Sequence, residues 1–68
     1  MEIFSQRLKE LRKIEKISQQ KLANILNVTA KSIYKWENGY SEPDFNTLAA
    51  IAKFFDVTCG YLIGIEEY

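Results

Sequence analysis

The side chains best placed for chemistry lie on one face of a short predicted helix near the middle of the chain. Lys31 and Lys35 are four residues apart, as are Ala30 and Tyr34, and residues four apart share a helix face. Lysine donates to guanine O6 and N7, an alanine methyl suits the thymine methyl, and tyrosine can reach a base or a sugar. We therefore predict these four residues as base contacts in the DNA major groove. A lysine-rich solvated face is the alternative interpretation.

Groups suited to phosphate flank that face. Gln19 opens the preceding predicted helix, where backbone N–H groups without a helical partner can point at an anion. Ser32 and Tyr40 add hydroxyl groups near the start and just past the end of the lysine-bearing helix. We predict phosphate contacts from Gln19, Ser32 and Tyr40. For Gln19, the alternative is an ordinary polar residue in a first helical turn.

The composition excludes most catalytic and metal-binding chemistry. The chain has no histidine and one cysteine, Cys59, so neither a zinc site nor a Cys/His nucleophile pair can be assembled. Its three glycines do not form a phosphate loop. We expect no metal, no cofactor and no enzymatic activity. A single cysteine permits no internal disulfide, and we expect a reduced, packed thiol, with a bridge between two chains as the alternative.

The elements that must position these groups are helices. Helical patterns run through all 68 residues and predict one compact all-α domain, residues 1–68, with five helices. The first covers about 3–15, a helix-turn-helix occupies about 18–38 with Asn27 in a left-handed turn, and a last helix and tail occupy 58–68. Four residues are predicted N-caps of the later helices: Ser18, Thr29, Asp44 and Thr58. Two glycines are predicted to end the third and fifth helices: Gly39 and Gly64.

Apolar residues spaced three and four apart mark the inner faces of these helices. Trp36 is predicted to be core rather than a platform for a ligand. The other predicted core residues are Phe4, Leu8, Leu11, Leu22, Ile25, Leu26, Ile33, Phe45, Leu48, Ala49, Ile51, Ala52 and Phe55. Phe54 is also predicted as mostly core, with the alternative that one of the adjacent residues Phe54 and Phe55 is exposed.

Charge is divided unevenly along a chain whose formal net charge is zero. Residues 1–41 hold eight Lys/Arg and four acids, a balance of +4, and residues 42–68 hold one lysine and five acids, a balance of −4. Such asymmetry suggests that one part meets a polyanion; solvated helix faces are the alternative. No apolar run approaches the ~18 residues of a membrane span, and no signal pattern opens the chain, so we expect a cytoplasmic, DNA-associated protein of prokaryotic or phage origin.

The C-terminal part is too apolar for a free end. A single small domain would bind DNA weakly, and a two-fold dimer doubles its contacts. We predict a homodimer surface there, with the alternative that these residues fold back to complete the core. The predicted surface comprises Phe54, Tyr61, Leu62, Ile63, Ile65 and Tyr68.

These motifs together resemble the lambda-repressor/Cro type of helix-turn-helix domain, also called xenobiotic-response-element-like. The resemblance covers nearly the whole chain, from residues 18–23 (Ser-Gln-x-x-Leu-Ala) through 32–39 (Ser-Ile-x-x-Trp-Glu-Asn-Gly) to 57–64 (Val-Thr-x-x-Tyr-Leu-Ile-Gly). It implies a five-helix fold that binds DNA. It also implies that Gln19 and Asn38 contact phosphates and that Arg12 and Glu37 form an ion pair between the first and third helices. In the family, the residue matching Gln19 also braces the first residue of the reading helix, a role lost where that residue is Ala30.

The chain departs from the family pattern at three positions. Asn27 and Lys16 stand where the family commonly has glycine, and Gly60 stands where it commonly has an acid. We expect a sequence-specific transcriptional regulator, a small dimeric repressor on a pseudo-palindromic operator. The alternative is a protein-interaction module or antitoxin built on the same fold, with an unidentified protein partner.

Overall fold

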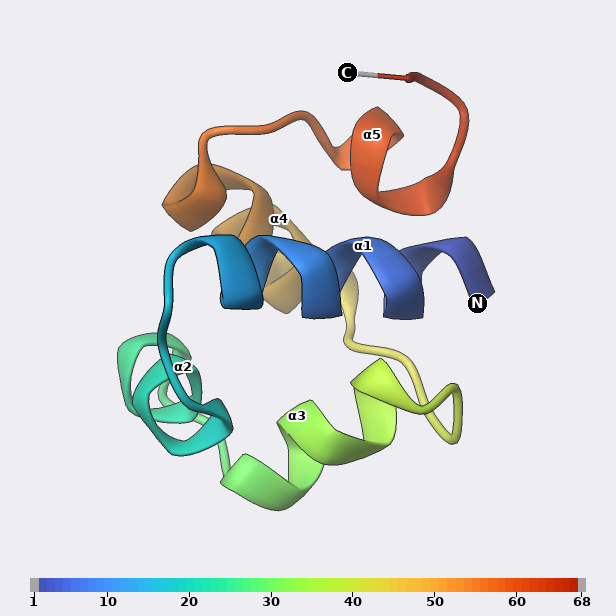
Figure 1. Cartoon of the computed structure of the whole chain (residues 1–68). Coiled ribbons are helices and arrows are strands. Elements are labelled where there is room, and N and C mark those ends of the chain that lie inside the picture. Colours follow the sequence, from blue (N-terminus) through green and yellow to red (C-terminus); the bar gives the residue numbers. More distant parts are fainter. Residues whose placement is uncertain (1, 68) are drawn as a thin grey trace.

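The computed structural model describes residues 2–67. Five helices follow in order: α1 (Glu2–Ile14), α2 (Gln19–Leu26), α3 (Ala30–Glu37), α4 (Phe45–Phe55) and α5 (Cys59–Ile63). Figure 1 shows α1 crossing the middle of the molecule, with α2 and α3 on one side, α5 on the other and α4 behind. Helix α1 contacts both α3 and α5. The all-α, five-helix prediction is confirmed, and the described residues include no strand.

Local side-chain hydrogen bonds start four of the helices, as predicted. The hydroxyl or carboxylate oxygens of Ser18, Thr29, Asp44 and Thr58 each accept the backbone N–H three residues later. Each cap satisfies a donor that has no partner within the helix. For Asp44, the backbone N–H of Thr47 is the main reason that the pKa of the carboxyl lies below its ordinary value.

One backbone motif ends all five helices. A left-handed residue follows each helix, and the next N–H bonds back to a carbonyl five residues earlier, the arrangement that satisfies the last free carbonyls. The five left-handed residues are Lys16, Asn27, Gly39, Asp56 and Gly64. The residues that donate the returning N–H are Ile17, Val28, Tyr40, Val57 and Ile65. Asn27 confirms the prediction, whereas Asp56 was not foreseen.

The side chains after these turns point in two directions. Ile17, Val28 and Val57 pack against the core, the usual companion of this motif. Tyr40 and Ile65 are instead exposed. The same backbone therefore turns an apolar side chain inward at three helix ends and outward at two, after α3 and after α5.

A single core joins the helices. Its buried residues are Phe4, Leu8, Leu22, Ala23, Ile33, Trp36, Leu48, Ile51, Ala52, Phe55 and Leu62, with Leu11 and Leu26 packed beside them. Three of the predicted core residues were wrong, because Ile25, Phe45 and Ala49 are exposed. Phe45 occupies the first position of α4, beyond the reach of the core, and is 89% exposed.

Candidate nucleic-acid interface

Helix α3 divides sharply into an inner and an outer face. Ile33, Trp36 and Glu37 are buried, whereas Lys31, Tyr34, Lys35 and Asn38 are exposed. The two lysines therefore project from the helix on the side opposite its packed residues. Because the inner face is packed, the direction in which the lysines point is fixed by the fold.

The remaining predicted contacts on α3 are less open. Ala30 is half-buried and packs against the core cluster, so only part of its methyl faces outward. Ser32 is also half-buried, and its hydroxyl lies 3.0 Å from the Thr29 hydroxyl at the start of the helix. The structure thus leaves Lys31 and Lys35 more exposed than Ala30.

A buried ion pair fixes the end of α3 against α1. Arg12 Nε donates to Glu37 Oε2 at 2.6 Å, and Arg12 Nη2 donates to Glu37 Oε1 at 3.0 Å. The side chains are 12% and 1% exposed, respectively. The hydrogen bonds to Glu37 hold the pKa of Arg12 above its ordinary value, although burial opposes the shift. Such a two-point contact between planar groups fixes direction as well as distance.

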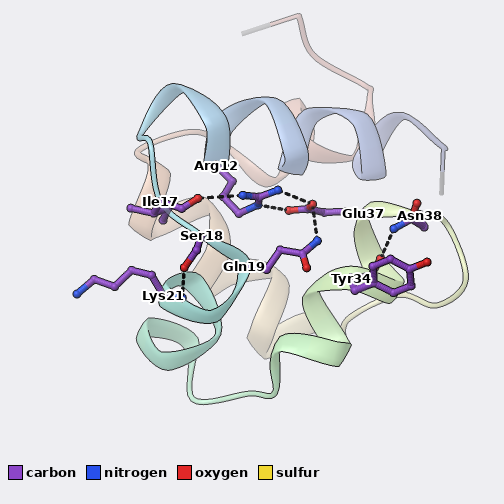
Figure 2. A network of polar contacts seen from close by, with 8 residues as sticks. All are labelled: Arg12, Ile17, Ser18, Gln19, Lys21, Tyr34, Glu37 and Asn38. Atoms are coloured by element: carbon purple, nitrogen blue, oxygen red, sulfur yellow. Dashed lines mark hydrogen bonds and ion pairs between the residues drawn. The ribbon is translucent and has the colours of Figure 1, made fainter.

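Gln19 completes this network from a third helix. Its Nε2 donates to Glu37 Oε1 at 3.1 Å, and Arg12 Nη1 donates to the Ile17 carbonyl oxygen at 2.9 Å. Figure 2 shows the three side chains converging between α1, α2 and α3. Among the described residues, no buried side-chain nitrogen or oxygen lacks a partner. The sequence predicted a phosphate contact for Gln19 through its backbone N–H, and the bond from its side chain to Glu37 was missed.

A second cluster lies just past the end of α3. Asn38 Nδ2 donates to the Tyr34 carbonyl oxygen at 2.8 Å, and Figure 2 shows the Tyr34 ring beside Asn38. The Tyr34 and Tyr40 rings are 6.3 Å apart between centroids and tilted by 47°. Two predicted contact residues, Tyr34 and Tyr40, thus touch one another on the surface.

The sequence and fold both match known helix-turn-helix proteins. A family model described as helix-turn-helix matches residues 8–62. The chain belongs to this helix-turn-helix family. The resemblance to lambda-repressor/Cro-type domains inferred from the sequence is confirmed, because the P22 c2 repressor in complex with synthetic operator 9T superposes with a TM-score of 0.89. That match has 27% sequence identity and covers 97% of this chain and 100% of the repressor chain.

Relatives of this helix-turn-helix chain include regulators of transcription. It is 39% identical over 64 residues to the HTH-type transcriptional activator BcrR of Enterococcus faecalis, covering 94% of this chain and 31% of BcrR. It is 39% identical over 65 residues to the uncharacterized HTH-type transcriptional regulator YqaE of Bacillus subtilis (strain 168), covering 96% of this chain and 56% of YqaE. The chain thus spans about a third to little more than half of these two relatives.

The C-terminal surface of this helix-turn-helix domain differs from the predicted one. Leu62 is fully buried and belongs to the core, because α5 packs it inward against α1 and α4; its assignment to a dimer surface was wrong. Phe54, Ile63 and Ile65 are exposed, and Tyr61 is half-buried. Tyr68 lies outside the described residues.

Phe45 and Cys59 also lie on the surface, although the sequence predicted both to be packed. Exposed Phe45 lines a surface hollow of about 470 Å³ that Pro43, Leu48 and Ile63 also line, so it adds apolar surface that the sequence assigned to the core. Cys59 is exposed, not packed as expected.

Arg7 holds the segment that follows α5. Its Nη1 donates to the carbonyl oxygens of Tyr61 and Glu66, the latter at 2.8 Å. Its guanidinium lies 4.2 Å from the centre of the Tyr61 ring, a cation–π contact. Thr58 Oγ1 donates to Glu66 Oε1 at 2.8 Å. Sequence reasoning missed Arg7, since nothing in the pattern joins it to residues more than fifty positions away.

Two kinds of feature are absent from the part of the chain that the structure describes. No group of three or more Cys, Asp or Glu side chains there could hold a metal ion. None of its helices is long and apolar enough to cross a membrane.

Proposed function

We propose that this chain is a sequence-specific, duplex-DNA-binding regulator of transcription that inserts α3 into the major groove. The observation that carries the proposal is the buried Arg12–Glu37–Gln19 network. It fixes the orientation of α3 against α1 and α2 and leaves Lys31 and Lys35 projecting outward. The structural match to a repressor bound to its operator supports the same role.

Base reading falls to Lys31 and Lys35, with the methyl of Ala30 at the start of the helix. Lysine can donate to guanine O6 and N7. Phosphate contacts are proposed for Gln19, Ser32, Asn38 and Tyr40. Because the Gln19 amide is engaged by Glu37, its contribution comes from the backbone N–H at the first position of α2, where no helical partner is available.

The regulator is proposed to act as a homodimer on a pseudo-palindromic operator with half-sites ~34 Å apart. Its self-association surface consists of the exposed apolar side chains of Phe45, Phe54, Ile63 and Ile65, with Tyr61 at the margin. Phe45 and Phe54 belong to α4, Tyr61 and Ile63 belong to α5, and Ile65 follows α5. Figure 1 shows α5 on the opposite side of α1 from α3, with α4 behind. Dimerisation through them leaves the lysines of both copies free for DNA.

Selection of binding sites from a random duplex pool at near-physiological salt tests the proposal. We expect enrichment of a two-fold symmetric motif. Lys31→Ala and Lys35→Ala should each weaken binding to that motif by about tenfold or more and relax the preference at one base pair per half-site. Lys53→Ala, which removes an exposed lysine of α4, is the matched control and should bind like the unmodified chain.

Failure to enrich any motif with folded protein would count against this function. It would favour the protein-interaction module, for which the exposure of Phe45 and Ile65 is the supporting observation. A hetero-complex that retains no DNA at ~0.1 M salt would identify that second function. Repression is the proposed direction of regulation, by analogy with the P22 c2 repressor. Activation is the alternative direction, because the relative BcrR is a transcriptional activator.

A further inference from the structure

The end of α3 carries an exposed pair of aromatic rings that the buried network does not use. Tyr34 is 48% exposed and Tyr40 is 72% exposed. Their ring centroids are 6.3 Å apart, within the range of favourable aromatic contacts. Two large rings that touch each other and remain open to solvent form a preassembled surface.

The backbone holds this pair in place. Gly39 has a φ of +77°, and the Tyr40 N–H donates to the Lys35 carbonyl oxygen at 2.9 Å, which returns Tyr40 toward α3. The Asn38 side chain donates to the Tyr34 carbonyl oxygen and closes the same turn. These hydrogen bonds fix the backbone of Tyr34 and Tyr40 relative to each other.

The position of the pair along α3 indicates what it meets. A helix of eight residues is about 12 Å long, close to the ~12 Å width of the major groove. When the first turn of such a helix meets the bases, its other end lies near the wall of the groove, where the sugar-phosphate backbone runs. Tyr34 is the fifth residue of α3, but Figure 2 shows its ring turned toward Asn38, which follows the helix, and the ring lies beside that of Tyr40.

We infer that Tyr34 and Tyr40 form a single contact to the DNA sugar-phosphate backbone, with Tyr40 positioning the Tyr34 ring. The inference rests on the proposed function and deepens it, because it moves Tyr34 from base reading to backbone anchoring. The ring faces pack against deoxyribose, and a phenol O–H can donate to a phosphate oxygen. Exposed Lys31 and Lys35 on the same helix supply the positive field that favours this partner.

This role predicts a distinctive signature. A backbone contact strengthens binding to every sequence, whereas a base contact strengthens binding to one. A phenol releases no counterion, so its loss leaves the salt dependence of binding unchanged, whereas loss of a lysine at a phosphate lowers the slope by about one. Loss of an uncharged backbone contact should therefore weaken binding to all sequences without changing the salt slope. This differs from loss of a lysine that reads a base and from loss of a lysine that binds a phosphate.

The test compares Tyr34→Ala, Tyr40→Ala and the double variant on the selected operator and on a scrambled duplex, across a range of salt concentrations. Each single variant should bind both duplexes about fivefold more weakly, with the salt slope and the re-selected motif unchanged. The double variant should lose less than the product of the single losses, because each ring positions the other. Tyr34→Phe and Tyr40→Phe keep the rings and should lose about twofold or less.

Three outcomes would overturn the inference. A loss confined to the operator, or a changed motif, would make Tyr34 a base reader. No loss on either duplex would show that the pair does not touch DNA. Losses that multiply without coupling would remove the positioning role of Tyr40. If the unmodified chain bound neither duplex, the proposed function itself would fail. Both rings are exposed, so the alanine variants should melt at the temperature of the unmodified chain.

Discussion

Two arginines of α1 secure opposite sides of the molecule in different ways. Arg12 forms an ion pair with the buried carboxylate of Glu37 at the end of α3. Arg7 donates hydrogen bonds to two backbone carbonyl oxygens, those of Tyr61 in α5 and Glu66 after it. A buried pair must keep both partners or leave a charge uncompensated, whereas the Glu66 carbonyl accepts an exposed hydrogen bond and can be rehydrated. The first attachment is therefore rigid and costly to lose, and the second is adjustable.

The surfaces at these two helix ends also differ, although the backbone motif is the same. The Tyr40 N–H donates to the Lys35 carbonyl oxygen, and in the sequence Ile65 is followed by Glu66 and Glu67. Basic neighbours suit a polyanion, and an aliphatic side chain flanked by acids does not. The same turn is thus followed by an exposed aromatic ring after α3 and by an exposed aliphatic side chain after α5.

The largest loss of stability is expected when the buried carboxylate of Glu37 is removed. Glu37→Ala should lower the free energy of unfolding by about 3–5 kcal/mol, because Arg12 is left partly buried without its partner. Urea denaturation measures the loss. The double variant Arg12→Met/Glu37→Leu is the control and should be markedly more stable than Glu37→Ala. Equal stability of the single variant and the unmodified chain would contradict a buried, coupled pair.

Buried Leu62 and exposed Ile65 should respond differently to truncation. Leu62→Ala should cost about 2–5 kcal/mol of unfolding free energy, since it opens a cavity in the core. Ile65→Ala should change unfolding by about 0.5 kcal/mol or less, while weakening self-association in sedimentation experiments. A large loss of stability from Ile65→Ala would place residue 65 in the core of the single chain.

The most local expected effect concerns Arg7. Arg7→Ala should cost about 1.5–3 kcal/mol of unfolding free energy, the range for hydrogen bonds made by a charged group, and should release the segment after α5. Amide hydrogen exchange at Ile65 and Glu66, whose N–H groups bond the Gly60 carbonyl, should accelerate. Exchange at Val28 should not change. Faster exchange at both places would mean that Arg7 supports the whole fold rather than this segment.

Local chemistry made the helix boundaries predictable. N-caps such as Ser18 and Thr58 act within three residues, and Asn27 tolerates a left-handed turn through its own short side chain. The inward faces were less certain, because Ile25 and Phe45 are apolar by type and exposed by tertiary placement. A clue for Phe45 was its position directly after the Asp44 cap, at the outer end of its helix.

The site was predictable as a set of residues more than as a geometry. The outward lysines follow from helical spacing alone. The hydrogen bond from Gln19 to Glu37 joins residues 18 positions apart on different helices, and no periodicity encodes it. The contact between Tyr34 and Tyr40 depends on the turn at Gly39, which the sequence signalled without indicating where the Tyr40 ring would point.

The division of charge has a kinetic consequence. Residues 1–41 carry +4 and residues 42–68 carry −4, and α3 lies on the opposite side of α1 from α5 (Figure 1). The molecule is consequently a dipole with no net charge, and the field of a nucleic acid exerts a torque on it before contact. Reorientation of this kind raises the fraction of productive encounters with a polyanion without adding affinity for arbitrary sequences. Under the proposed function, the chain would therefore approach DNA with α3 already facing the duplex.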